Sequence, residues 1–185
     1  MAINSEKVVI SPWAQKEIDV PSDVTLPEFI FRSLREKLPS IGDVPFVIDV
    51  VTGKEIPFSK LEEMCKSLAA SLWHRGLRRG SVLFFTTHEH ALIYVVQIAC
   101  WMCGAASRGC FPWEDAEEME RQMRESQPQM ILCDPDTAST VLSVLPKLDM
   151  PQTELLSLCG PVEGAVSVED LIEKADVPLR EFPLK

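Results

Sequence analysis

The chain has 185 residues, of which 46% are hydrophobic and 25% charged, and its formal net charge at pH 7 is −10. This length and composition are those of a soluble globular protein with one sizeable core. The acidic balance argues against a protein that binds a nucleic-acid backbone, because such binding needs clustered Lys and Arg.

Hydrophobic spacing and turn residues predict an alternation of helices and strands. After an extended arm at residues 1–24, the predicted helices span residues 25–42, 59–76, 91–103, 115–126, 136–145 and 167–172. The predicted strands span residues 46–51, 56–58, 81–87, 105–110, 129–133 and 154–158. Such alternation predicts an α/β fold, in which helices flank a mainly parallel sheet. We expect one such unit at residues 25–175, followed by a tail at 176–185.

Several helix ends carry recognisable cap residues. The patterns Thr25–Glu28 and Ser59–Glu62 are capping boxes, in which a hydroxyl oxygen accepts a hydrogen bond from the backbone three residues on. Gly76 can take the left-handed conformation that ends a helix. We also expect Asp136 to be the N-cap of the helix that follows the strand at 129–133.

The cysteines and the ends of the chain bear on location. The chain shows no secretion signal, and its longest apolar stretch, residues 91–106, is shorter than the roughly 20 residues of a membrane-spanning helix. We therefore expect a cytoplasmic protein without a transmembrane segment, whose thiols are reduced. The spacing Cys100–Cys103 also occurs in metal and redox sites. We interpret both residues as small buried hydrophobes, because no second such pair exists.

Three polar clusters invite a functional interpretation, and each has a simpler structural one. Gly76–Gly80 lacks the glycine density of a phosphate loop and is interpreted as a helix stop before a strand. His88 and His90 are two residues apart, so they cannot both bind one metal ion from a regular helix, and we expect Thr87 or Glu89 to cap the helix there. Asp134–Asp136 is interpreted as a strand-to-helix turn rather than a metal pair.

The aromatic residues point to packing rather than to a ligand site. Trp73, Trp101 and Trp113 are interpreted as core or subdomain-contact residues, and Met119 and Met123 as the inward face of a helix. The sequence therefore predicts no catalytic residue and no metal ligand, and it identifies no cofactor-binding residue.

The order of these motifs resembles the N-terminal region of the acyl-adenylate-forming (AMP-binding) superfamily, which includes acyl-CoA synthetases, coumarate–CoA ligases and luciferases. The resemblance covers residues 25–175. It rests on the helix start at Thr25, the strand Pro45–Asp49, the turn Thr52–Gly53, Phe58–Leu61, Leu68–Ala69, Gly76, Gly80, Cys103–Ala105, Pro112, Glu118–Met123 and Met130–Leu132. The chain departs from the family pattern at Ser81, where Asp is usual, at Thr87–Glu89, where Asn-Ser is usual, and at Phe111, where Asn is usual.

The resemblance implies a two-step reaction that uses ATP, Mg²⁺ and CoA. A small carboxylic acid, of fatty-acid or phenylpropanoid metabolism, first forms an acyl-adenylate and then a thioester. The phosphate loop and the mobile C-terminal domain of the family are expected downstream of Lys185. A peroxisomal location is open for a full-length parent.

Two hypotheses follow for the chain itself. In the first, it is the N-terminal fragment of an acyl-CoA synthetase-like enzyme, catalytically incomplete alone, whose partner is the downstream part of the enzyme or a related subunit. In the second, it is a stand-alone interaction module or a non-catalytic binder of an acyl or aryl ligand. An unrelated flavodoxin-like fold is a weaker alternative, because it needs a phosphate loop where the chain has only Thr52–Lys54.

Overall fold

The computed structural model describes residues 21–88 and 90–174. Most of the predicted arm (residues 1–20) and the whole predicted tail lie outside the described residues. The elements are α1 (Leu26–Ile41), β1 (Pro45–Ile48), β2 (Glu55–Pro57), α2 (Phe58–His74), β3 (Val82–Thr86), α3 (Leu92–Met102), β4 (Ala106–Gly109), α4 (Ala116–Ser126), β5 (Met130–Cys133), α5 (Pro135–Val144), the 3₁₀-helix η2 (Leu145–Lys147), β6 (Glu154–Ser157), β7 (Val166–Ser167) and α6 (Val168–Glu173).

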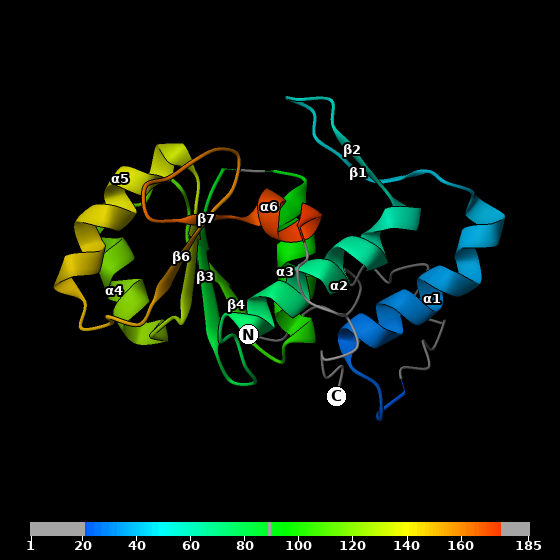
Figure 1. Ribbon diagram of the computed structural model, residues 1–185, viewed down its shortest axis with the longest axis horizontal. Helices are drawn as coiled ribbons and strands as arrows, with labels where there is room; N and C mark the ends of the chain where they lie inside the picture. Colours follow the sequence, from blue (N-terminus) through cyan, green and yellow to red (C-terminus); the bar gives the residue numbers. More distant parts are fainter. Residues whose placement is uncertain (1–20, 89, 175–185) are drawn as a thin grey trace, which may run out of the picture.

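The main sheet is parallel, and helices lie on both of its faces. Its strand order in the described residues is β4-β3-β5-β6-β7, and every neighbouring pair is parallel. α2, α3 and α6 lie on one face and α4 and α5 on the other (Figure 1). β1 and β2 form a separate antiparallel hairpin. The predicted α/β class is thus confirmed.

Alternation along the strands divides the core into two clusters. Leu83 of β3 packs with the apolar residues of α2 and α3, whereas its neighbour Phe84 packs with Met119 and Met123 of α4. All four side chains are fully buried. Successive residues of a strand point to opposite faces, so a short apolar strand supplies both clusters at once.

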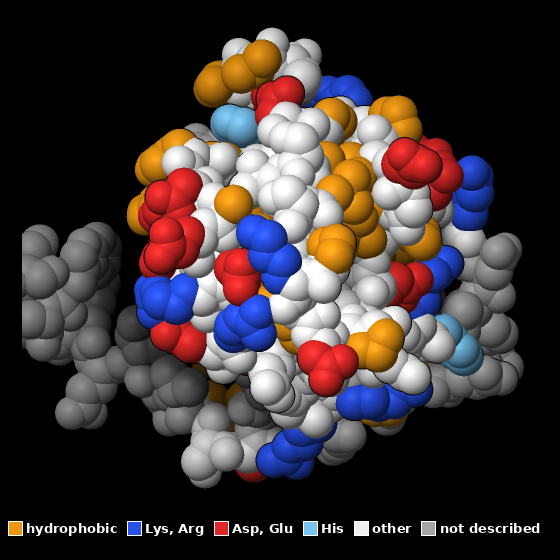
Figure 2. Space-filling model, turned by 90° about the vertical axis from the view of Figure 1, so that its left-hand side faces the viewer, with side chains coloured by type: hydrophobic (Ala, Val, Ile, Leu, Met, Phe, Trp, Pro, Cys, Tyr) orange, Lys and Arg blue, Asp and Glu red, His pale blue; other side chains and the backbone are white. Residues whose placement is uncertain are grey.

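The outer surface of α4 is charged with both signs. Arg121 of α4 bonds to Glu118 at 2.6 Å and also pairs with Glu125, and Arg124 bonds to Glu120 at 2.8 Å. Acidic and basic side chains are interspersed over this face (Figure 2). Exposed pairs of this kind add at most about 1 kcal/mol each to stability, so the inward methionines, not the ion pairs, hold α4 on the sheet.

The cap predictions had different outcomes. Thr25 is the N-cap of α1, and its side chain accepts from the N–H of Glu28. The predicted capping box at Ser59 is wrong, since α2 begins at Phe58 and its N-cap makes no side-chain bond. The N–H of Phe58 donates to the carbonyl of Val44 at 3.1 Å, so the hairpin sets where this helix starts.

The first strand is shorter than predicted. It ends at Ile48 because Asp49 turns the chain: Asp49 Oδ1 accepts from the N–H groups of Val51 and Thr52 at 3.0 and 2.9 Å. Asp and Asn commonly make such turns with the backbone two and three residues ahead.

Within the described residues, no helix is both long enough and apolar enough to span a bilayer.

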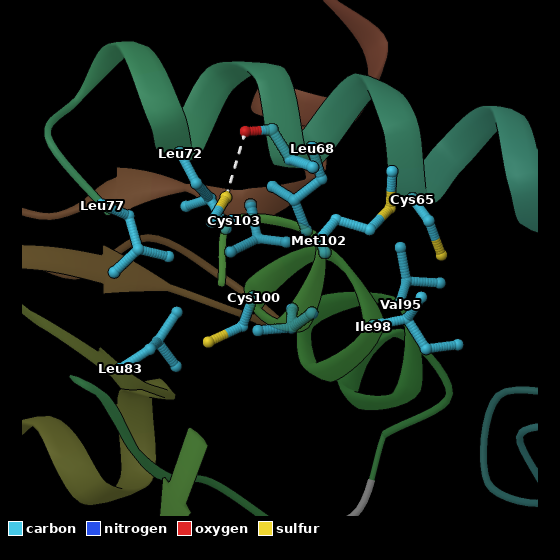
Figure 3. Close-up of a cluster of buried hydrophobic side chains, with 14 of the residues drawn as sticks. Cys65, Leu68, Leu72, Leu77, Leu83, Val95, Ile98, Cys100, Met102 and Cys103 are labelled. Carbon is cyan, nitrogen blue, oxygen red and sulfur yellow. Dashed lines mark hydrogen bonds between the residues drawn. The ribbon is translucent and has the colours of Figure 1, made fainter. Parts of the chain in front are cut away.

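All six cysteines are free thiols, and five of them are buried. Cys103 lies against α2, where its Sγ is 3.5 Å from the carbonyl oxygen of Ala69, whereas Cys100 points toward Leu83 of the sheet (Figure 3). The two side chains therefore point in different directions. Burial is the main cause that raises the pKa of both thiols to about 12. These positions match the predicted packing role.

We expect only one thiol of the native chain to react with a thiol reagent before the chain unfolds. That thiol is Cys159, which is exposed, and the other five should react only after unfolding. Burial raises the pKa of Cys159 to about 11, so its labelling should remain slow at pH 8. The measurement is a timed colorimetric titration, and Cys159→Ser is the control that should remove the native reaction. Native labelling of a second cysteine would contradict this packing.

Candidate functional site

The carboxyl ends of the parallel strands meet at one edge of the sheet, which is the candidate site. β3 continues through α3 to β4 on one side, whereas β5 continues through α5 to β6 on the other side. The crevice between the ends of β3 and β5 is therefore the point where the strand connections diverge. Open α/β sheets bind their ligands at such points.

His88 and Asp134 meet at this crevice. Thr86 of β3 pairs with Cys133 of β5, which places the next residues of both strands opposite each other. The backbone N–H of His88 donates to Asp134 Oδ2 at 2.6 Å, and His88 Nδ1 lies 3.0 Å from the same oxygen. A hydrogen bond between these two atoms needs a proton on Nδ1, because a carboxylate oxygen can only accept.

Asp134 also starts α5, which corrects the predicted cap. Its Oδ1 accepts from the N–H of Thr137 at 2.8 Å, and the Thr137 hydroxyl in turn accepts from the N–H of Asp134 at 3.1 Å. Asp136, the predicted N-cap, has a side chain that is 85% exposed and lies inside the helix. The reason is Pro135, which occupies the first helical position and leaves the cap to the residue before it.

Hydrogen bonds set the charge state of Asp134. Burial raises the pKa of this carboxyl group, but the bonds from His88 and Thr137 outweigh that effect, and the pKa lies below its ordinary value. Asp134 is therefore an anion at neutral pH, although its residue is only 4% exposed. Its two oxygens join the loops after β3 and β5.

A cation would have to compete with these bonds. Ligand atoms of His88, Asp134 and Asp136 lie within 4.8 Å of one another. Both oxygens of Asp134 already accept N–H groups, however, and His88 Nδ1 is a donor to one of them. Mg²⁺ takes oxygen ligands in a strict octahedron. These three side chains therefore do not fit Mg²⁺. The expectation from the sequence that the chain holds no metal site stays a prediction.

A second histidine contacts a second aspartate beside the first pair. His90 Nδ1 accepts from the N–H of Leu92 at 3.2 Å, and its Nε2 lies 3.8 Å from Asp49 Oδ2. The hydrogen bond from the backbone of Thr52 is the main cause that lowers the pKa of Asp49. The N-cap of α3 is Ala91, which makes no side-chain cap bond, so the expected cap at Thr87 is wrong, and His90 accepts the first N–H of the helix instead. Glu89 lies outside the described residues.

Sequence reasoning missed both histidine–aspartate pairs, although a signal existed. Asp134 directly follows β5 and His88 lies two residues after β3, whereas Asp49 follows β1 of the separate hairpin. In a parallel sheet, the residues that follow the strands share an edge, so polar residues in those places can meet. As their spacing predicts, the two histidines face different carboxylates.

Two adjoining cavities open beside these pairs. Their volumes are about 420 and 760 Å³, and both are lined by Val51, Phe85, Thr87 and His88. Trp113 lines the larger cavity; it is 73% exposed and stacks on Phe111 with a ring separation of 4.8 Å. Of the two predicted roles of Trp113, the core role is wrong, because most of its surface faces solvent, and the subdomain-contact role stays a prediction.

The loop Gly76–Gly80 does not fit a triphosphate. A phosphate-binding loop offers free backbone N–H groups, but here these groups bond within the chain. The N–H groups of Leu77, Gly80 and Ser81 donate to the carbonyls of Leu72, Gly104 and Arg78 at 3.0, 3.1 and 2.9 Å. The predicted helix stop is confirmed by Gly76, whose φ is 102°. Arg75, Arg78 and Arg79 beside the loop are exposed, and the guanidinium of Arg78 lies 4.2 Å from the Trp73 ring centroid.

Comparison with known proteins adds sequence and fold similarity. The family described as AMP-binding enzyme matches residues 35–181. The 4-coumarate–CoA ligase-like 1 of Arabidopsis thaliana is 26% identical over 160 residues, which cover 86% of this chain and 28% of that relative. The 4-coumarate–CoA ligase 3 of the same species is 28% identical over 116 residues, which cover 63% of this chain and 20% of the relative.

Solved structures share the fold over most of the chain. The luciferase-like enzyme from the nonluminescent mealworm Zophobas morio superposes with a TM-score of 0.74 at 16% identity, over 90% of this chain and 38% of its own. A benzoate CoA ligase from Burkholderia xenovorans LB400 superposes with a TM-score of 0.67 at 14% identity, over 80% of this chain and 28% of its own. The chain thus spans 20 to 28% of these two relatives and 28 to 38% of these two structures.

Proposed function

The chain belongs to the family of AMP-binding enzymes, and from this premise we propose that it forms the N-terminal part of an acid–thiol ligase. The observation that carries the proposal is the family match over residues 35–181, which includes nearly all of the described fold. The reaction of the whole enzyme would join a small carboxylic acid to ATP and then to CoA. Residues 25–175 would be one subdomain of its large domain.

The part that these residues play is structural. They supply a rigid parallel sheet, and the His88–Asp134 pair holds the loops at its carboxyl edge in place. The N–H groups of the loop Gly76–Gly80 bond within the chain and so do not cradle a phosphate, and ATP and Mg²⁺ would be held by other polypeptide. That polypeptide would be the downstream part of the enzyme or a related subunit.

We place the protein in the cytoplasm. One relative carries the name peroxisomal OPC-8:0-CoA ligase 1, so a peroxisomal location of the full-length parent is the alternative.

We expect the chain alone to catalyse no adenylation. The measurement is ATP–pyrophosphate exchange with Mg²⁺ and a panel of fatty and aryl carboxylic acids. A chimera in which this chain replaces the matched 160 residues of 4-coumarate–CoA ligase-like 1 should retain exchange. The control is the same ligase without the matched stretch, which should be inactive. Exchange by the isolated chain, or a folded chimera without exchange, would count against the proposal.

A further inference from the structure

Exposed apolar side chains gather at the carboxyl edge of the sheet. Many of the large apolar residues that stay exposed line the two adjoining cavities, namely Ile48, Val50, Val51, Tyr94, Phe111 and Trp113. Val50 and Val51 are 93 and 90% exposed. Contiguous apolar surface of this kind marks an interaction site. We call these six residues the edge surface.

The edge surface is held in one shape by hydrogen bonds and ring stacking. The turn that carries Val51 is fixed by Asp49, whose Oδ1 accepts the N–H of Val51 at 3.0 Å. The rings of Phe111 and Trp113 are stacked with an interplanar angle of 11°. A surface already in its binding shape loses little conformational entropy when a partner docks.

The charges at its rim indicate the kind of partner. Glu114 lines the larger cavity and Asp136 stands beside His88, whereas one basic residue, Lys54, is exposed in the turn that carries Val51. In the part of the chain that the structure describes, neither acidic residue pairs with a Lys or Arg. A second copy would bring the same acidic rim against this one, and like charges suppress such contacts. Complementarity therefore favours a partner with a basic rim.

We propose that the edge surface docks a polypeptide whose contact face is apolar and surrounded by Lys and Arg. This polypeptide is the part of the ligase that the relatives possess beyond the stretch matched here, so the inference rests on the proposed function. Trp113 and Phe111 are its aromatic anchors, as in interfaces where buried aromatic residues carry most of the binding energy.

The test measures the accessibility of the edge surface in the chimera described above. Val51→Cys reports on the surface, and Leu142→Cys, on an exposed site about two turns along α5, is the matched control. Both are made in a Cys159→Ser background, in the isolated chain and in the chimera. We expect maleimide labelling at position 51 to be slower by about tenfold or more in the chimera than in the isolated chain. The reagent would then reach position 51 only when the docked polypeptide opens transiently. Labelling at position 142 should stay unchanged.

A second variant separates contact from folding. Trp113→Ser in the chimera should restore fast labelling at position 51 and reduce ATP–pyrophosphate exchange, while Leu142→Ser should do neither. Equal labelling of position 51 in an active chimera would overturn the docking surface and leave the proposed function standing. A folded chimera without exchange would count against the proposed function itself. Protection of position 51 that grows with the concentration of the isolated chain would show self-association and overturn the chosen partner.

Discussion

Replacing Asp134 with alanine should lower the free energy of unfolding by roughly 2–4 kcal/mol, because buried N–H groups lose their acceptor. The change would leave the backbone N–H groups of His88 and Thr137 without their carboxylate partner. The measurement is urea denaturation followed by circular dichroism. Asp136→Ala is the matched control two residues away, and it should change stability by less than about 0.5 kcal/mol, since its side chain is exposed.

The same residue predicts an acid-dependent loss of stability. The pKa of Asp134 in the folded chain lies below its ordinary value, which is about 3.9. The contribution of the carboxylate is therefore fully present above the unfolded-state pKa and lost as pH falls through the folded-state value. The stability difference between the wild type and Asp134→Asn should be constant from about pH 5 upward and shrink below about pH 4. A difference that grows toward low pH would contradict this role.

Replacing Phe84 with alanine should cost about 3–5 kcal/mol, which is a large share of the stability of an ordinary domain. Phe84 is fully buried on β3, and this strand pairs with β4 on one side and β5 on the other. The cavity left by the ring would open beside Met119 and Met123. The loss of stability is measured by urea denaturation, in which the free energy of unfolding should fall with urea concentration at the same slope in both proteins.

Phe111→Ala is the control with the same chemistry at an exposed position. Its ring is 59% exposed, so the change should cost less than about 1 kcal/mol of stability. Should Phe84→Ala fail to fold, Phe84→Leu keeps most of the volume and should cost less than about 1.5 kcal/mol. Equal costs for Phe84→Ala and Phe111→Ala would contradict the two-cluster core.

The described elements follow the predicted ones closely, because their signals are local. The N-cap at Thr25 and the stop at Gly76 depend on residues within one turn of the helix end. Two errors lay where local signals do not suffice. α2 begins at Phe58 because the hairpin carbonyl of Val44 accepts its N–H. β7 has two residues, Val166 and Ser167, which is too short for a periodic pattern to show.

The candidate site was less predictable for the same reason. The residue types at its centre were visible, but His88 and Asp134 are 46 residues apart, and only the parallel pairing of β3 and β5 brings them together. The N-cap was placed at Asp136 instead of Asp134, although Pro135 was a local signal for the correct position.

The sequence by itself determined the α/β class and the family, because caps, glycine stops and hydrophobic periods act over a few residues and their order survives low identity. The tertiary structure alone decided which polar residues meet and which apolar ones stay exposed. Val51 and Trp113 read as ordinary apolar residues in the chain, yet the fold leaves both in solvent at the edge where His88 meets Asp134. Exposure depends on what the rest of the chain covers, and no local pattern records that.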